Sequence, residues 1–191
     1  MEKKGMMHLI EINRTLAAQH NLDQLLETMM DAAVDLLQAE RGFILLLEGT
    51  EFRVRVARNL DKKAIDGQGG RYSRTIANKA ASTARAILVA NAREDSRFRE
   101  AESVIEQDIR SAAAVPLKLG PEVIGVVYVD SRFEPGLFDE DHKTLLEAFA
   151  DQAAVAVRNA RQMQEIWDLN RILKERLLER EGEVTDLKER Y

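Results

Sequence analysis

The sequence predicts an α+β protein that contains two β-hairpins and ends in a long helix. Residues 43–57 (FILLLEGTEFRVRVA) and 110–130 (RSAAAVPLKLGPEVIGVVYVD) each hold two runs of β-forming apolar residues joined by a short glycine-containing turn. From Leu137 to Tyr191 the chain has no proline and a single glycine, with charged and apolar residues at helical spacing. Hairpins and a long helix in this order indicate an α+β fold.

Two amphipathic helices are expected before the first hairpin. Residues 8–20 place apolar side chains at helical spacing, and residues 22–39 carry a wider apolar stripe. Asn21 is suited to the N-cap of the second helix, and Gln24 follows in the position of a capping-box partner. The break between the two helices is therefore predicted at His20–Asn21.

The middle of the chain alternates between loops, short helices and strands. Glycines follow one another closely in 67–70, but their spacing fits neither a P-loop nor a dinucleotide-binding fingerprint. Ser73 is a predicted N-cap of a short helix, residues 86–92 read as a third strand, and residues 93–107 as a polar loop leading into a helix. In the second hairpin, residues 123–129 are apolar on both faces, which predicts a strand in the middle of the sheet.

The long helix, with Asp139 as its predicted N-cap, carries a heptad pattern. Its a and d positions are largely apolar from Phe149 to Tyr191, and the polar Asn170 at an a position is typical of parallel dimers. The alternative is a single helix that lies across its own domain. The dimer interpretation places these residues in the seam: Phe149, Ala156, Met163, Ile166, Asn170, Leu173, Leu177 and Val184.

Composition limits the classes of function. The net charge is −5 with acids and bases interleaved, so no direct contact with nucleic acid is expected. No apolar run is long enough to span a bilayer, and no signal peptide is evident, so we expect no membrane contact. The chain has no cysteine, which suits the cytoplasm. No nucleophile with a base, converging carboxylates or metal cluster is found at plausible spacing, so an enzyme is not expected.

Several segments together resemble a GAF domain: ERGFILLLE, YSRTIANKA, ILVANAREDSRF, SAAAVPLKLGPEVIGVVYVDSR and FDEDHKTLLEAFADQAAVAVRNAR. The resemblance implies a central antiparallel sheet of five or six strands. It places the terminal helices on one face and a ligand pocket, covered by loops and short helices, on the other. We expect residues 1–20 to form a dimer-associated helix, 21–161 the GAF domain, and 162–191 a coiled-coil linker.

The resemblance also bears on cofactors. Bilin-binding members attach their chromophore through cysteine, and members that reduce methionine sulfoxide use catalytic cysteines, so neither activity is expected here. Haem would need a histidine in the pocket, and a non-haem iron sensor of this family also uses cysteine. His8, His20 and His142 lie in or beside helices, so no haem, iron or other metal is expected. Only Phe138 and Asp141 match the cyclic-nucleotide signature of the family. This partial match neither predicts nor excludes the binding of a cyclic nucleotide.

Polar residues on the loop side are the candidates for holding a ligand. An arginine among them could bind a carboxylate or phosphate with two hydrogen bonds, or could pair with a neighbouring acid such as Glu94 or Asp95. Arg41 and Asp130, which flank the first and last strands, are more often structural. The candidates are Arg58, Tyr72, Ser73, Thr75, Arg93, Asp95, Ser96, Arg97, Ser111, Tyr128 and Asp130.

Two functions follow from the resemblance. In the first, a cytoplasmic sensor binds an unidentified small molecule and signals through the dimeric helix to a covalently linked output domain outside this sequence. The last residues, EVTDLKERY, resemble the linker before the AAA+ ATPase of NtrC-type transcriptional activators; histidine kinases and diguanylate cyclases also follow such helices. In the second, a ligandless GAF fold serves only for dimerisation. A pocket filled with bulky side chains would favour the second.

Overall fold

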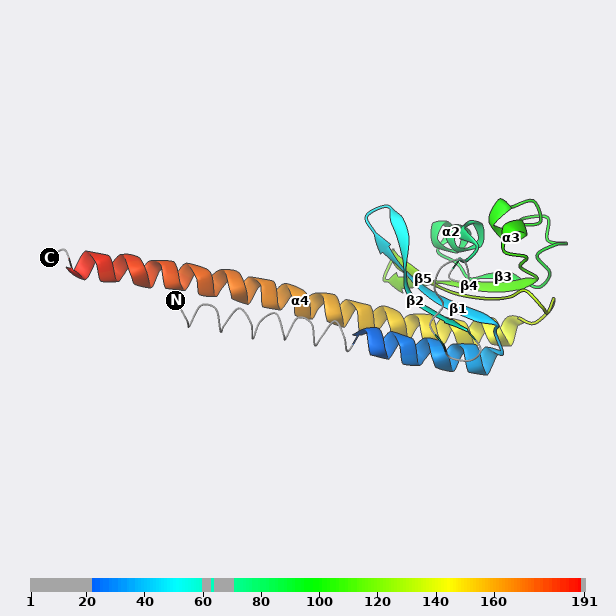
Figure 1. Cartoon of the computed structure of the whole chain (residues 1–191), viewed down its shortest axis with the longest axis horizontal. Coiled ribbons are helices and arrows are strands. Elements are labelled where there is room, and N and C mark those ends of the chain that lie inside the picture. Colours follow the sequence, from blue (N-terminus) through cyan, green and yellow to red (C-terminus); the bar gives the residue numbers. More distant parts are fainter. Residues whose placement is uncertain (1–21, 60–62, 64–70, 190–191) are drawn as a thin grey trace. The chain divides into compact units, whose positions relative to one another are not determined.

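The computed structural model describes residues 22–59, 63 and 71–189, with side chains described up to residue 177. After a helix at 22–37, the elements are β1 (Arg41–Glu48), β2 (Glu51–Asn59), α2 (Arg74–Thr83), β3 (Ile87–Val89), α3 (Glu102–Glu106), β4 (Ser111–Leu119), β5 (Glu122–Ser131) and α4 (Glu140–Glu189) (Figure 1). Residues 21–156 form one compact unit, and residues 157–191 belong to a second. The predicted helix at 8–20 and the cap at Asn21 lie outside the described residues.

The five strands form one antiparallel sheet in the order β2-β1-β5-β4-β3. Both predicted hairpins are present, and β5 lies in the middle of the sheet, as its two apolar faces predict. The third strand is much shorter than the predicted 86–92 and pairs with only three residues of β4.

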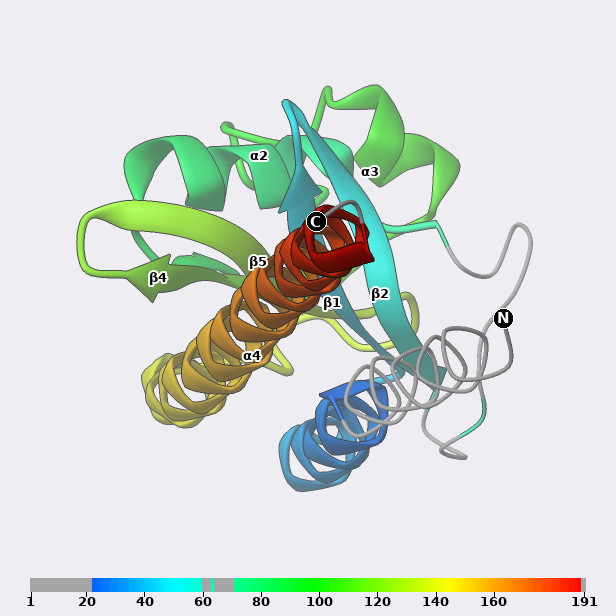
Figure 2. The same ribbon diagram turned by 90° about the vertical axis from the view of Figure 1, so that its left-hand side faces the viewer.

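Each face of this sheet is covered by helices. Helices α2 and α3 lie on one face, and the helix at 22–37 and the first turns of α4 lie on the other (Figure 2). On the second face, a Cβ on Gly42 would lie 2.3 Å from the sulfur of Met30 and 2.7 Å from Val34, so glycine is needed for this close approach. The first turns of α4 bury Leu146 and Ala150.

The predicted N-caps of α2 and α4 are confirmed. The Ser73 hydroxyl accepts a hydrogen bond from the backbone N–H of Ile76 at 3.3 Å, which satisfies one free donor of α2. At the start of α4, a carboxylate oxygen of Asp139 accepts from the N–H of His142 at 2.9 Å. This hydrogen bond lowers the pKa of the Asp139 carboxyl because it favours the ionised form.

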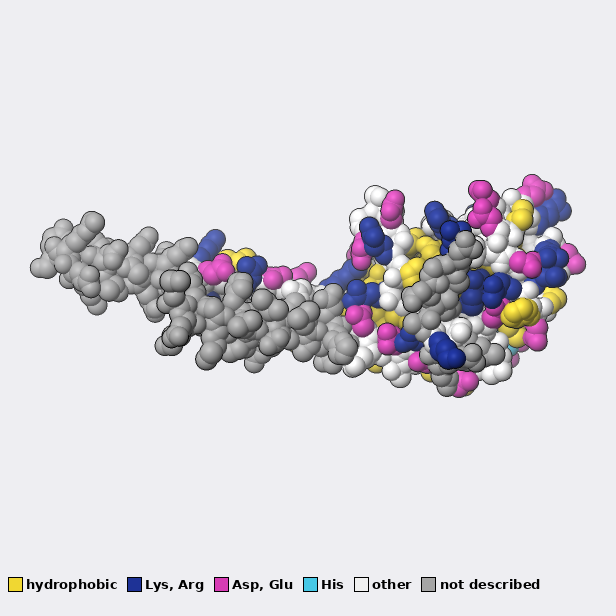
Figure 3. Space-filling model, viewed as in Figure 1, with side chains coloured by type: hydrophobic (Ala, Val, Ile, Leu, Met, Phe, Trp, Pro, Cys, Tyr) yellow, Lys and Arg dark blue, Asp and Glu magenta, His cyan; other side chains and the backbone are white. Residues whose placement is uncertain are grey.

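The surface carries both signs of charge close together. On the face shown in Figure 3, basic and acidic side chains alternate over the described part of the molecule. Within the described residues, no helix is long and apolar enough to cross a membrane.

Candidate functional site

A buried polar cluster joins the ends of the two central strands. Arg41 of β1 is the direct cross-strand partner of Asp130 of β5, and its Nε and Nη2 donate to the two carboxylate oxygens at 2.8 and 2.7 Å. The hydroxyl of Tyr128 donates to the same carboxylate at 3.0 Å. Burial raises the pKa of the Asp130 carboxyl, against the opposing effect of the guanidinium, and raises that of Tyr128 well above its usual value.

This cluster also reaches the chain segment that leads into α2. A third nitrogen of Arg41 donates to the backbone carbonyl of Arg71 at 3.1 Å. The side chains of Arg41 and Asp130 are only 3% and 0% exposed. Asp130, a predicted ligand contact, is therefore committed to internal hydrogen bonds, as is Tyr128.

Bulky side chains fill the sheet face beneath α2 and α3. Phe43, Tyr72 and Tyr128 pack ring against ring, with centroids 5.9 to 6.0 Å apart. Phe98 and Val104 are buried in the same cluster. The predicted floor of a pocket, formed by the β4–β5 hairpin, is thus covered by a packed core in the described part of the chain.

A pocket, which we call the Tyr72 pocket, lies beside this core at the tip of the first hairpin. It has a volume of about 250 Å³, and Tyr72 is the one predicted ligand contact in its wall. Burial raises the pKa of the Tyr72 hydroxyl, while the nearby Arg74 guanidinium opposes the shift. No ion pair joins Arg74 to another described residue, so its charge is available to an anion. The lining residues are Thr50, Glu51, Phe52, Tyr72, Arg74 and Asn78.

Three of the predicted contacts are hydroxyls bonded to other parts of the protein. The hydroxyls of Ser73 and Thr75 lie 3.0 and 3.1 Å from that of Ser103 on α3, so they tie α2 to α3. The Ser111 hydroxyl is buried and donates to the backbone carbonyl of Glu134 at 2.7 Å. These bonds give the three hydroxyls a structural role.

The predicted contacts between residues 93 and 97 lie in the loop before α3. Arg97 and Asp95 pair with each other, and Arg97 also donates to the carbonyl of Leu88 at 2.9 Å. Arg93 pairs with Asp108 at 2.5 Å and not with the neighbouring Glu94. Ser96 is exposed. The structure does not bring these four predicted contacts to the Tyr72 pocket.

Arg58 requires a correction, because the structure places it away from the loop side. Its guanidinium forms ion pairs with Glu27 at 2.7 Å and with Asp31 at 3.0 Å, both on the helix at 22–37. The cause is a β-bulge in β2: Ile44 pairs with Val56 and Leu45 with Val54. The extra residue changes which face the following side chains point to.

The predicted seam residues follow α4 from one unit into the other. Phe149 and Ala156 are half-buried, whereas Met163, Ile166, Leu173 and Leu177 are 46%, 52%, 56% and 61% exposed. Asn170 is also exposed, and Val184 lies where side chains are not described. Leu169 and Ile172 are exposed beside this row.

Several pocket residues were not predicted from the sequence. Arg74 and Asn78 lie four residues apart on α2, which begins just after Tyr72. This spacing, together with the Ser73 cap that predicts the start of α2, could have indicated that both side chains lie on the same face of the helix.

Among the described residues, no group of three acidic or histidine side chains could hold a metal ion. The expectation of no bilin, haem or iron stays a prediction.

Comparisons with known proteins place this architecture in a family. The family model of the GAF domain matches residues 19–158. A dual 3′,5′-cyclic-AMP and -GMP phosphodiesterase 11A from Takifugu rubripes is 27% identical over 168 residues, and hybrid signal transduction histidine kinase G from Dictyostelium discoideum is 25% identical over 75 residues. The matches cover 78% and 39% of this chain but only 19% and 2% of those proteins.

A solved structure shares the fold. The photoproduct state of the GAF3 domain of Slr1393 from Synechocystis sp. PCC6803 superposes with a TM-score of 0.64 at 15% identity. The likeness covers 76% of this chain and 98% of that domain. The five-stranded antiparallel sheet with helices on both faces agrees with this likeness. The chain belongs to the GAF domain family.

Proposed function

We propose that this chain is a sensory and regulatory module that passes a signal through α4 to a covalently linked output domain. GAF membership and the two matched signalling proteins support a regulatory role. The helix α4 supports the route, because its 50 residues form one unbroken helix whose first turns pack in the compact unit of the sheet and whose remainder belongs to the second unit. A continuous helix transmits a rotation or shift of its first turns along its length.

The observation that carries this proposal is the row of exposed apolar residues on α4. Met163, Ile166, Leu173 and Leu177 occupy consecutive a and d positions around Asn170, and each is about half exposed. Such a row is unfavourable in water and is buried when two helices pair. We propose that two copies pair along this row as a parallel homodimer, with Asn170 fixing the register.

The proposed input is a small molecule in the Tyr72 pocket. Its lining joins the hairpin tip to α2, and the unpaired Arg74 gives it one free positive charge among the described residues. A ligand there would change how the hairpin and α2 pack on the sheet. It shifts α4 only if it binds the two signalling states with different affinity.

For the output domain we propose an AAA+ ATPase of an NtrC-type transcriptional activator. This rests on the resemblance of residues 183–191 to the linker in those proteins. The phosphodiesterase and the histidine kinase show that related domains occur beside other outputs.

The packed core beneath α2 and α3 favours a second candidate, a ligandless dimerisation module. Phe43, Phe98 and Tyr128 are at most 2% exposed and occupy the face on which a ligand would lie. A thermal-shift screen of cyclic nucleotides, 2-oxo acids, amino acids and small anions separates the two candidates. A saturable rise in Tm that Arg74→Gln removes supports the sensor, because such a rise requires binding to the folded state. The absence of any rise supports the second candidate.

Sedimentation equilibrium tests the dimer that both candidates require. We expect Leu173→Asp to weaken association strongly, because it places a charge in the seam. Asn170→Leu should strengthen it, because the polar residue costs stability. Glu175→Gln, outside the seam on the same helix, is the control. An unchanged dissociation constant for both seam variants would count against the seam.

A further inference from the structure

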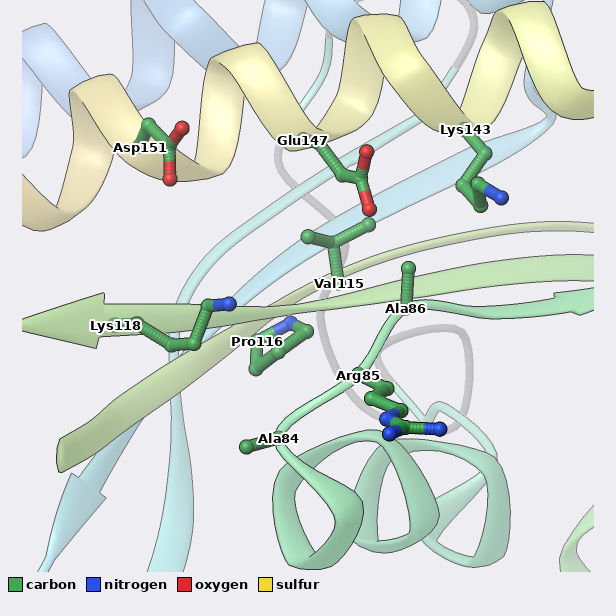
Figure 4. Close-up of a pocket in the computed structure, with 9 residues that line it drawn as sticks. All are labelled: Ala84, Arg85, Ala86, Val115, Pro116, Lys118, Lys143, Glu147 and Asp151. Atoms are coloured by element: carbon green, nitrogen blue, oxygen red, sulfur yellow. The ribbon is translucent and has the colours of Figure 1, made fainter. Parts of the chain in front are cut away.

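A groove lies at the edge of the sheet, away from the Tyr72 pocket. Strand β3 pairs with β4 only as far as Ala114, so the rest of β4, from Val115 to Leu119, has no partner strand on that side among the described residues. The first turns of α4 and the segment Ala84–Ala86 line this groove, which has a volume of about 520 Å³ (Figure 4). This is within the usual range for small-molecule sites.

The two walls of the groove carry opposite charges. Glu147 and Asp151 extend from α4 on one side, and Arg85 and Lys118 lie on the other (Figure 4). None of these four side chains forms an ion pair with any residue that the structure describes. Lys143, also on the α4 wall, pairs with Glu140, and the pKa of its ammonium is raised by this hydrogen bond and by the nearby charges of Glu140 and Glu147.

Apolar side chains separate the charged walls. Ala86, Val115 and Pro116 lie between them, with the side chains of Ala86 and Val115 directed toward α4 (Figure 4). A peptide strand is a poor fit to this edge, because Pro116 lacks an N–H and Lys118 places a charge there, two features that resist strand addition. A small molecule with a short apolar middle is the better fit.

We propose that this groove binds a zwitterionic small molecule whose ammonium and carboxylate groups are separated by several methylene groups. The ammonium pairs with Glu147 and Asp151, and the carboxylate pairs with Arg85 and Lys118. The bound molecule thereby connects the edge of β4 to α4. The groove would be an input to α4 that does not depend on the Tyr72 pocket or on the identity of the output domain.

Titration of the ¹⁵N-labelled chain by NMR tests the proposal. The probes are 4-aminobutyrate, 5-aminovalerate and 6-aminohexanoate, each of which carries both charges. Hexanoate and hexylamine match the longest probe but carry one charge each. We expect at least one amino acid to shift the amide signals around Arg85, Lys118 and 143–151 saturably, and both singly charged molecules to bind about tenfold more weakly.

Variants then test each wall. Lys118→Gln and Asp151→Asn should each weaken binding about threefold, as expected for exposed ion pairs. Lys79→Gln on α2 and Glu165→Gln on α4 are controls outside the groove and should leave binding unchanged. The proposal is overturned if no amino acid gives saturable shifts, if the shifts lie elsewhere, if the singly charged molecules bind equally well, or if the wall variants behave like the controls.

Discussion

Removal of the Asp130 carboxylate tests how the central strands are held together. Asp130→Leu deletes the acceptor of two hydrogen bonds from Arg41 and one from Tyr128. Because both ionic partners are buried, the guanidinium is left with an uncompensated charge, which costs about 3–5 kcal/mol of unfolding free energy. That is a large fraction of the ~5–15 kcal/mol that stabilises a typical domain.

Urea unfolding at neutral pH, followed by circular dichroism, measures this cost. The double variant Arg41→Met with Asp130→Leu should lose less stability than the sum of the single variants, because it removes both charges. Tyr128→Phe, which keeps the ion pair, should cost only about 1.5 kcal/mol. Glu48→Ala breaks the exposed pair with Arg53 and should cost at most about 1 kcal/mol. A loss below about 1 kcal/mol for Asp130→Leu, or simple additivity in the double variant, would refute the reasoning.

Three further changes test local features of the fold. Gly125→Ala would place a Cβ 2.3 Å from the carbonyl oxygen of Leu45 and should destabilise the domain by about 3 kcal/mol in urea unfolding; a loss under about 1 kcal/mol would contradict the close approach. Ser73→Ala removes the N-cap of α2 and should cost about 1 kcal/mol, whereas Ser73→Thr, which keeps the hydroxyl, should recover part of this loss. Asp139 has a lowered pKa in the folded state, so its contribution to stability is present at neutral pH and lost as the pH falls below about 4. The Tm of Asp139→Asn should therefore fall less than that of the unchanged chain between pH 5 and pH 3, and an equal fall would show that this carboxylate does not contribute.

Much of the fold follows from local patterns in the sequence. Residues 123–129 of β5 are apolar on both faces, and this predicted the place of the strand in the middle of the sheet. Ser73 and Asp139 were recognisable as caps because their side chains serve backbone donors within the same turn. Features of this kind depend on residues a few positions apart.

The candidate site depends on longer-range geometry that local patterns do not contain. Arg41 and Asp130 are 89 positions apart, and only the pairing of β1 with β5 brings them together. Alternation in 52–56 indicated a regular strand, but the bulge turns Arg58 toward the helix at 22–37. The groove arises because β3 begins at Ile87, opposite Ala114, so that β4 from Val115 onward has no partner strand on that side among the described residues.

The central claim, that two copies pair in parallel along α4, can be tested directly because the chain has no cysteine. Leu173→Cys places one thiol at a d position of the seam, and Glu175→Cys places one outside it. In a parallel pair the two thiols at 173 meet, whereas those at 175 face away from each other. Under mild oxidation, we predict that the 173 variant forms a covalent dimer on a non-reducing gel much faster than the 175 variant. Equal rates, or no covalent dimer at 173, would contradict parallel pairing along this seam.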